Sequence, residues 1–206
     1  AYTYSEPIVH LEYVLDTASL AREKGLKNVL VSNGYINPEP AEELLELMDA
    51  ANIDFKSWSD DFYRQEIGGR VEEVKRFLRQ ACGRTSLEVT TLVIPTKNDS
   101  PEEIEAIARF LASLSPDIPY HLSAYYPQYK YTIPPTPPST LHRLAEAARK
   151  HLHYVYLGNV GVEETSTSCA NCGSLLVRRR GYSVSVKGIE DGRCRECGAP
   201  SPITGL

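Results

Sequence analysis

The 206-residue sequence has no long apolar run, no excess of basic charge and few cysteines. No apolar stretch approaches the roughly 20 residues that a membrane-spanning helix needs, and no secretory signal pattern opens the chain. With 22 basic and 27 acidic side chains, the formal net charge is -5. This balance does not favour non-specific binding to nucleic acid or to an anionic membrane. These absences predict a cytoplasmic globular protein without a membrane partner.

The five cysteines are too few and too unevenly placed for a disulfide scaffold. Cys82 stands alone, whereas the others form two C-x2-C-G pairs near the end of the chain: Cys169 with Cys172, and Cys194 with Cys197. Two such turns are typical of tetrahedral thiolate coordination, and the glycine after each pair relieves a tight backbone turn. The spacing predicts a structural zinc ribbon. Rubredoxin-like iron and an auxiliary iron-sulfur cluster use the same ligands and stay open as alternatives.

Short β-rich runs alternate with amphipathic stretches up to about residue 158, a pattern typical of βα units and a parallel sheet. The expected strands are 1–4, 28–32, 52–56, 87–94, 119–126 and 154–157, and the expected helices are 8–24, 39–50, 71–81, 101–114 and 139–151. Ser100, Pro101 and Glu103 predict an N-cap, a first-turn proline and a capping-box acid. The fold class is therefore α/β.

A change in composition predicts a boundary after residue 158. Residues 1–158 read as a partial (β/α)6 TIM-like barrel, and residues 159–206 as a small appendage that contains the four clustered cysteines. Within the appendage, "LLVRRRGYSVSVKG" reads as a hairpin that turns near Gly181.

Several expected strands alternate apolar residues with polar or ionisable ones. The alternation directs one set toward the helices and the other toward a shared interior. The interior set is Tyr2, Tyr4, Glu6, Asp54, Lys56, Glu88, Thr90, His121, Ser123 and Tyr125, whereas Leu122, Ala124 and Tyr126 are expected to face the helices. Since burying unpaired charges is costly, these groups either pair with one another, as Lys56 could with Glu88 or Asp54, or bind a polar ligand.

The sequence resembles the radical S-adenosylmethionine (radical SAM) enzymes, in particular the pyruvate formate-lyase activating enzymes and their relatives, the AmmeMemoRadiSam-system radical SAM proteins. The matching segments run in the family's order along nearly the whole chain: "AYTYSEP", "VSNGYINPEP", "NIDFKSW", "EVTTLVIPTKNDS", "HLSAYYPQYK", "PPTP", "CANCG" and "CRECG". The resemblance implies a radical SAM barrel that binds SAM and, with a [4Fe-4S] cluster, cleaves it to a 5'-deoxyadenosyl radical.

The resemblance also implies the roles of single residues near the first two strands. Glu6 takes the place of the acid in the family's glycine-glycine-glutamate motif, where a carboxylate accepts hydrogen bonds from the SAM amino group. Tyr4 and Ser5 stand where the activating enzymes have glycines. Ser32, Asn33 and Gly34 correspond to the family's threonine-asparagine-glycine turn, near the same amino-acid part of SAM.

Further along the chain, "DFK" corresponds to the family's aspartate-leucine-lysine motif. The resemblance implies that Lys56 pairs with the SAM carboxylate and that Asp54 lies beside it. Glu88, His121 and Tyr125 are assigned to the same cofactor pocket. The family also implies an external electron donor and a protein or small-molecule substrate.

One departure from the family decides what the chain can do alone. The family holds its cluster with a C-x3-C-x2-C loop after the first strand, and this sequence has no such motif. We therefore expect these 206 residues to bind SAM without cleaving it. The opening "AYTYSEP" reads as the end of an interior strand, with the first strand and the cluster cysteines in a preceding segment.

An alternative from a different functional class is a non-catalytic binding protein, a partial barrel without a cluster. Its ribbon would contact a protein or, less favoured, a nucleic acid through Arg178, Arg179, Arg180 and Tyr182.

Overall fold

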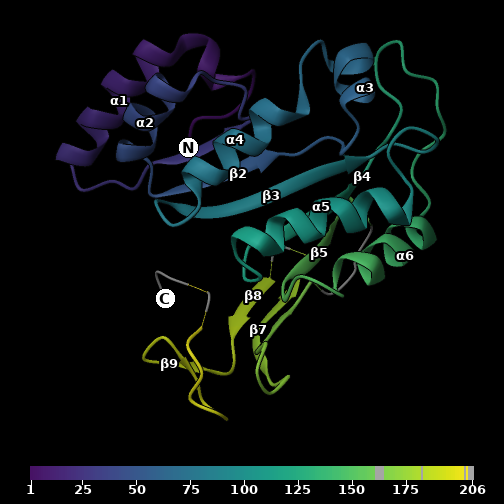
Figure 1. Ribbon diagram of the computed structural model, residues 1–206. Helices are drawn as coiled ribbons and strands as arrows, with labels where there is room; N and C mark the ends of the chain where they lie inside the picture. Colours follow the sequence, from purple (N-terminus) through teal and green to yellow (C-terminus); the bar gives the residue numbers. More distant parts are fainter. Residues whose placement is uncertain (161–164, 182, 202, 204–206) are drawn as a thin grey trace.

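The computed structural model describes residues 1–160, 165–181, 183–201 and 203. Its first part alternates helices with parallel strands (Figure 1). The strands are β1 (Val29–Ser32), β2 (Ala50–Asp54), β3 (Ser86–Val93), β4 (Tyr120–Ala124) and β5 (Val155–Gly158). The α-helices are α1 (Leu11–Glu23), α2 (Pro38–Leu47), the short α3 (Asp60–Phe62), α4 (Val71–Ala81), α5 (Pro101–Leu114) and α6 (Pro138–Ala148).

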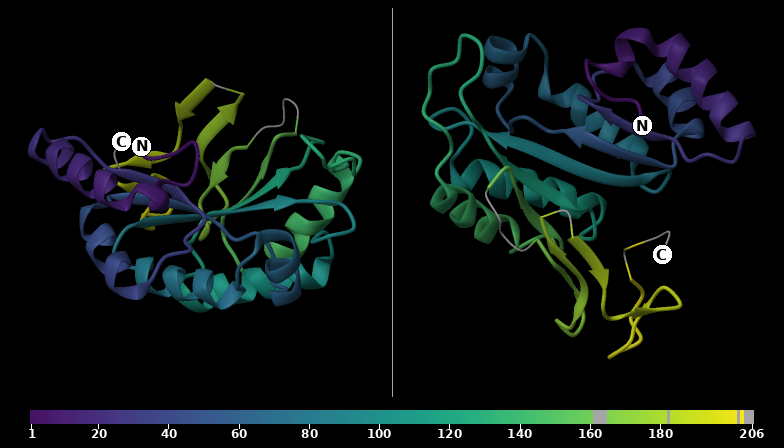
Figure 2. Two further views of the ribbon diagram at one scale, coloured as in Figure 1. Left: turned by 90° about the horizontal axis from the view of Figure 1, so that it is seen from above. Right: turned by 180° about the vertical axis from the view of Figure 1, so that it is seen from behind.

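The five strands form one parallel sheet in the sequential order β1-β2-β3-β4-β5. The helices follow one face of this curved sheet, and the segment after β5 lies on its other side (Figure 2, left). The largest side chains between sheet and helices include Phe55, Phe77, Ile107, Leu111 and Leu122, all fully buried. The α/β class and the parallel partial barrel predicted from the sequence are thus confirmed.

The first expected strand is reduced to one parallel bridge. Tyr2 pairs with Leu30, donating its N–H to Val29 and accepting from the N–H of Val31. The chain then turns away, because Tyr4 and Ser5 adopt left-handed φ angles of 58° and 61°. The described part of the chain therefore has five strands in its parallel sheet where six were expected.

All five expected helices exist. Those expected at 71–81 and 101–114 have these bounds, and the other three have shifted ends. The first begins as a 3-10 turn, η1 (Pro7–His10), before α1, and the second ends at Leu47 because β2 already starts at Ala50. The sequence pattern missed α3 and the π-helical turn η2 (Tyr63–Ile67) that follows it. This segment of three plus five residues is too short to show a helical period.

Helix α5 begins as expected, since the Ser100 hydroxyl accepts the N–H of Glu103 at 3.1 Å. The capping-box role of Glu103 is wrong. Its carboxylate instead crosses to the loop after β2, where it accepts the Ser57 hydroxyl and, at 2.9 Å, the N–H of Trp58. Glu103 therefore joins a helix to a loop that is distant in sequence.

The tail carries short antiparallel strands: β6 (Thr167–Ser168), β7 (Leu175–Arg180), β8 (Ser183–Val186), β9 (Ile189–Glu190) and β10 (Arg193–Cys194). β7 and β8 form the predicted hairpin, with Gly181 in its turn at φ 57°. Tyr182, proposed to contact a partner, lies outside the described residues. A small core separate from the main one contains Cys169, Leu176 and Cys194.

Alternate residues of the strands face the side of the sheet away from the helices. Asp54, Glu88, Thr90, His121 and Ser123 are all partly exposed there, while their neighbours along each strand are buried. The alternation fails beyond β4, where the expectation was that Tyr125 faces the interior and Tyr126 the helices. Tyr125 is buried and Tyr126 is 52% exposed, because the strand ends at Ala124 and its pleat ends with it.

Among the described helices, none has the length and the apolar character that a membrane crossing needs.

Candidate functional site

Four of the predicted cofactor residues border one cleft of about 280 Å³, which we call the Glu6–Lys56 cleft. The four are Glu6, Asn33, Asp54 and Lys56. They come from three segments that meet because β1 and β2 pair in parallel, so that their carboxyl ends lie side by side. A cleft that combines two carboxylates, an amide and an ammonium suits a small ligand carrying both charges.

Glu6 ties the opening segment to the loop after β1. Its Oε1 accepts the Ser32 hydroxyl at 2.6 Å and the N–H of Ile8 at 3.2 Å, and its Oε2 accepts the N–H of Asn33 at 2.8 Å. Ser32 is itself buried and anchors this carboxylate. Since a carboxylate has about four acceptor positions, Glu6 keeps capacity for one more donor from a ligand.

Gly34 follows this anchor and has little space around it. Its φ is +66°, and a Cβ built there would lie 3.0 Å from Ile53 Cγ2 and 3.1 Å from the Phe77 ring. The turn after β1 therefore requires glycine both for its backbone conformation and for its close approach to the core.

Lys56 and Asp54 form an ion pair at the end of β2, with 2.7 Å between Nζ and Oδ2. Of the two pairings considered from the sequence for Lys56, the structure contains the one with Asp54. The two side chains are 32% and 42% exposed, so a ligand can reach both.

The backbone of Lys56 is held from both sides. Its N–H donates to the Tyr63 hydroxyl at 3.0 Å, and its carbonyl accepts from the Asn98 amide at 2.6 Å. Asn98 is 1% exposed and makes two further bonds, to the carbonyl of Leu92 and from the N–H of Ile94. Burial raises the pKa of Tyr63, so its hydroxyl stays protonated.

Sequence reasoning missed the segment that closes this cleft. Tyr63, Ile67, Gly68, Gly69 and Val74 line it together with the predicted residues. The only sequence signal was the glycine pair, which marks a loop without saying what the loop faces.

Glu88 and His121 lie in a different cleft, toward the amino-terminal ends of β3 and β4. His121 Nε2 and Glu88 Oε2 are 2.8 Å apart, and this hydrogen bond lowers the pKa of Glu88. Tyr125 borders neither cleft. Its ring packs on that of Tyr131 at 6.1 Å, and its hydroxyl is buried without a partner among the described residues.

The four tail cysteines converge as their spacing predicted. Their sulfur atoms all lie within 4.8 Å of one another, with Cys169 and Cys197 at 3.7 Å and Cys172 and Cys194 also at 3.7 Å. A metal with bonds of about 2.3 Å to four tetrahedral thiolates needs sulfur separations close to these. The cluster is therefore a metal-binding site by geometry and by ligand type.

Groups around Cys194 and Cys197 favour thiolates at these two positions. Ser174 Oγ lies 3.1 Å from both Cys172 Sγ and Cys194 Sγ. This hydroxyl, with the N–H groups of Cys197 and Glu196, lowers the pKa of Cys194 to about 6. Hydrogen bonds from Asn171 and Ala199 lower the pKa of Cys197. A deprotonated sulfur is the form that binds a metal ion.

Two curated proteins align with much of the chain. An uncharacterized protein of Methanocaldococcus jannaschii, MJ0808, is 39% identical over 205 residues, covering 96% of this chain and 61% of that protein. Isethionate sulfite-lyase activating enzyme of Oleidesulfovibrio alaskensis is 31% identical over 122 residues, covering 56% of this chain and 40% of the enzyme. The chain thus spans less than two thirds of either relative.

Among solved structures, a domain of pyruvate-formate lyase-activating enzyme from Bacteroides vulgatus superposes with a TM-score of 0.66. The superposition covers 77% of this chain and 97% of that domain. At 18% sequence identity, it shows likeness of fold alone. The family model for the radical SAM superfamily matches residues 1–111, more than half of the chain. From the fold, the matched residues and these relatives, we conclude that the chain belongs to the radical SAM superfamily and resembles its activating enzymes.

Proposed function

We propose that this chain binds SAM in the Glu6–Lys56 cleft as part of a radical SAM enzyme of the activating-enzyme type. The observation that carries the proposal is the convergence of Glu6, Asn33, Asp54 and Lys56 on one small cleft. These four residues are spread over 50 positions of the sequence. Membership of the radical SAM superfamily supports SAM as the ligand.

The charges of the cleft match the amino-acid end of SAM. Lys56 would hold the carboxylate, while Glu6 and Asp54 would accept hydrogen bonds from the amino group. Apolar side chains of Ile8, Val9 and Ile67 border the same cleft and would cover uncharged parts of the ligand. Together with a reduced cluster, bound SAM would be the source of the superfamily's 5'-deoxyadenosyl radical.

The cysteines of this chain do not fit a [4Fe-4S] cluster beside the cleft. Cys82 lies between α4 and β3, at the other end of the sheet from the cleft, and the remaining four form the tail cluster. We therefore propose SAM binding for these residues, and reductive cleavage to the 5'-deoxyadenosyl radical only for a protein that also supplies the cluster ligands. The radical would abstract a hydrogen atom from a protein or small-molecule substrate. An external donor would supply the electron for the cleavage of SAM.

Calorimetric titration of the chain with SAM tests the binding site. We expect Lys56→Gln to weaken binding about tenfold or more, because a charge-assisted bond contributes about 1.5–3 kcal/mol. Lys24→Gln is the matched control, since Lys24 is exposed at the end of α1. Equal affinity of Lys56→Gln and the unchanged chain would contradict the proposal.

The enzymatic part needs a protein that also carries the cluster ligands. After anaerobic reconstitution with iron and sulfide, we expect 5'-deoxyadenosine to form from SAM on reduction. An intact cluster that forms no 5'-deoxyadenosine would contradict the enzyme proposal. The titration would still test SAM binding independently.

For the tail we propose a structural zinc ion held by Cys169, Cys172, Cys194 and Cys197. Four thiolates leave no open position on zinc, which supports a folding role over a catalytic one. Contact of the tail with a partner, the alternative from the sequence, stays a prediction.

A further inference from the structure

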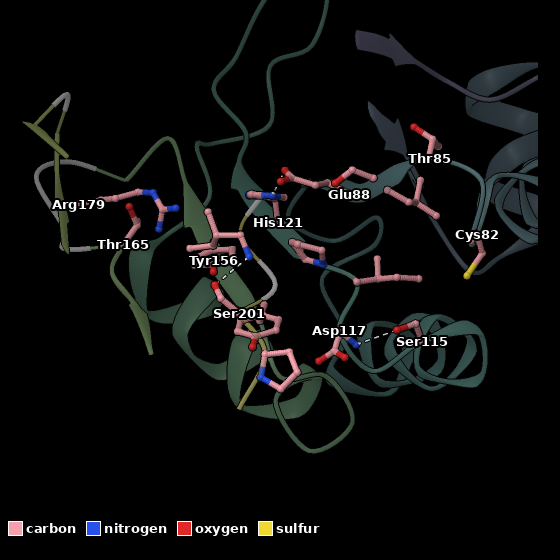
Figure 3. Close-up of a pocket in the computed structure, with 18 of the residues that line it drawn as sticks. Cys82, Thr85, Glu88, Ser115, Asp117, His121, Tyr156, Thr165, Arg179 and Ser201 are labelled. Carbon is pink, nitrogen blue, oxygen red and sulfur yellow. Dashed lines mark hydrogen bonds and ion pairs between the residues drawn. The ribbon is translucent and has the colours of Figure 1, made fainter. Parts of the chain in front are cut away.

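A cleft of about 710 Å³ between the sheet and the tail has no role in the proposed function (Figure 3). We call it the His121–Arg179 cleft. It lies where β3, β4 and β5 begin, and the tail contributes Thr165, Arg179 and Ser201 to its wall. It shares no lining residue with the Glu6–Lys56 cleft. A ligand bound here would touch both the sheet and the tail.

A row of polar groups follows this cleft from the sheet to the tail. It starts at the Glu88–His121 pair, and the His121 ring then stacks on that of Tyr156 at 5.4 Å between centroids. The Tyr156 hydroxyl lies 2.8 Å from the Thr167 hydroxyl, which in turn accepts the Arg179 guanidinium at 2.5 Å. The row therefore runs from a carboxylate at one end to a guanidinium at the other.

Arg179 is the cationic end and has donors to spare. No carboxylate of a described residue lies within 4 Å of its guanidinium, which donates to the neutral hydroxyl of Thr167. A guanidinium has five N–H donors arranged in a planar fork that suits a carboxylate. Arg179 is partly buried, whereas its neighbours Arg178 and Arg180 are exposed. The strand thus turns one arginine of three inward.

The anionic end has a free acceptor, because Glu88 uses only Oε2 in its bond to His121. Asp117 lines another part of the same cleft, beside Ser115 (Figure 3). Asp117 is held by His153 Nδ1 at 2.8 Å. A ligand ammonium or N–H group would find an acceptor at Glu88.

The walls between the two ends are apolar. Leu87, Ile118, Pro119, Leu157 and Ile203 line the cleft. Pockets for small organic molecules typically combine such walls with a few polar groups that fix orientation. The volume leaves room for a ligand larger than a single inorganic ion.

We propose that the His121–Arg179 cleft binds a zwitterionic ligand of the amino-acid or short-peptide class. Arg179 holds the ligand's carboxylate, and the ammonium faces Glu88. The aromatic stack of His121 and Tyr156 and the apolar walls contact the part between the charges. This site goes beyond the proposed SAM site, and its test needs neither SAM nor a cluster.

The test uses the unblocked tripeptide Ala-Tyr-Ala as the probe, in calorimetric titration of the metal-loaded chain. We expect saturable binding. C-terminal amidation of the peptide removes the carboxylate and should weaken binding at least about fivefold, and N-terminal acetylation should have a similar effect. These comparisons need no change in the protein, so folding cannot confuse them. Absence of saturable binding up to about 10 mM, or equal binding of the amidated peptide, would overturn the proposal.

Variants then assign the two ends. Arg179→Gln should weaken binding of the unblocked peptide at least about fivefold. It should leave the affinity for the amidated peptide unchanged, as in a double-mutant cycle. Arg180→Gln on the same strand is the matched control and should change neither. Glu88→Gln should affect the unblocked peptide more than the acetylated one. An equal loss in Arg180→Gln, or full competition by inorganic phosphate at the peptide's own concentration, would exclude a zwitterion site at Arg179.

Discussion

At the residue scale, the Glu6–Lys56 cleft depends on side chains and backbone groups that a ligand would not touch. Gly34 lets the turn after β1 approach the core, and Asn98 holds the carbonyl of Lys56 from the far side. Both residues shape the cleft without lining it. Substituting them therefore tests how the cleft is held in place and removes no direct contact with the ligand.

Gly34→Ala compared with Gly25→Ala isolates the close approach. Both glycines have positive φ angles, +66° and +72°, but only Gly34 has atoms within 4 Å of a built Cβ. We expect Gly25→Ala to lower the free energy of unfolding by about 1–2 kcal/mol through backbone strain alone. Gly34→Ala should cost about 1–3 kcal/mol more from overpacking against Ile53 and Phe77. Urea denaturation measures the free energy of unfolding of both variants. Equal decreases would mean that the core around Ile53 and Phe77 accommodates the added methyl group without a further loss of stability.

Asn98→Ala tests the support of Lys56. Three buried hydrogen bonds are lost, so we expect the free energy of unfolding to fall by about 2–4 kcal/mol and SAM affinity to fall with it. Asn37→Ala is the control, because Asn37 is exposed and makes no capping bond with its side chain. Unchanged SAM affinity in folded Asn98→Ala would show that Lys56 does not need this support.

At the scale of elements, α5 is joined to the loop after β2 through Glu103. The carboxylate reaches Ser57 and Trp58, which follow Lys56 directly. Trp58 in turn lies under the Lys75 ammonium of α4, 3.5 Å from the ring centroid. Two helices thus fix the loop that leads away from the cleft.

Glu103→Gln should lower the free energy of unfolding by about 1–3 kcal/mol, since an amide loses the charge that strengthens both bonds and can turn a donor toward Trp58. The neighbouring Glu102→Gln is the control, because Glu102 is exposed in the same first turn. Chemical denaturation of the two variants side by side gives the difference. A loss shared by both would point to the helix dipole instead of the cross-link.

At the scale of the whole molecule, the described residues form two hydrophobic cores of very different size. The main core lies between sheet and helices, and the tail core consists of a few residues around two of the cysteines. A core this small does not fold by burial alone, so we expect the tail to depend on its metal.

Cys194→Ser should remove stoichiometric metal from the purified protein and expose the tail amides to hydrogen exchange, while the sheet keeps its protection. Elemental analysis also distinguishes zinc from iron. Cys82→Ser is the matched control, since Cys82 lies outside the cluster and should leave the metal content at one ion per chain. Retained metal in Cys194→Ser, or loss of protection throughout the sheet, would refute this division.

Much of the fold and part of the site could be predicted from the sequence. Periodicity places the strands and helices, because alternation and helical spacing are properties of local segments. The four-cysteine cluster and the polar groups of β2 to β4 follow from spacing in the same way. Element ends were less accurate: the first strand shrank to the bridge at Tyr2, and the alternation failed at Tyr125, where β4 had already ended.

The sequence by itself determined the α/β class, the metal-binding cysteines and the family. The tertiary structure alone decided which predicted residues share a cleft. It brought Glu6 to Lys56 and separated both from Glu88 and His121. The physical reason is that alternation tells which face of a sheet a side chain takes, whereas its height along the strand depends on register between strands. Register arises from packing and from bonds between segments distant in sequence, such as Glu6 to Asn33 and Asn98 to Lys56.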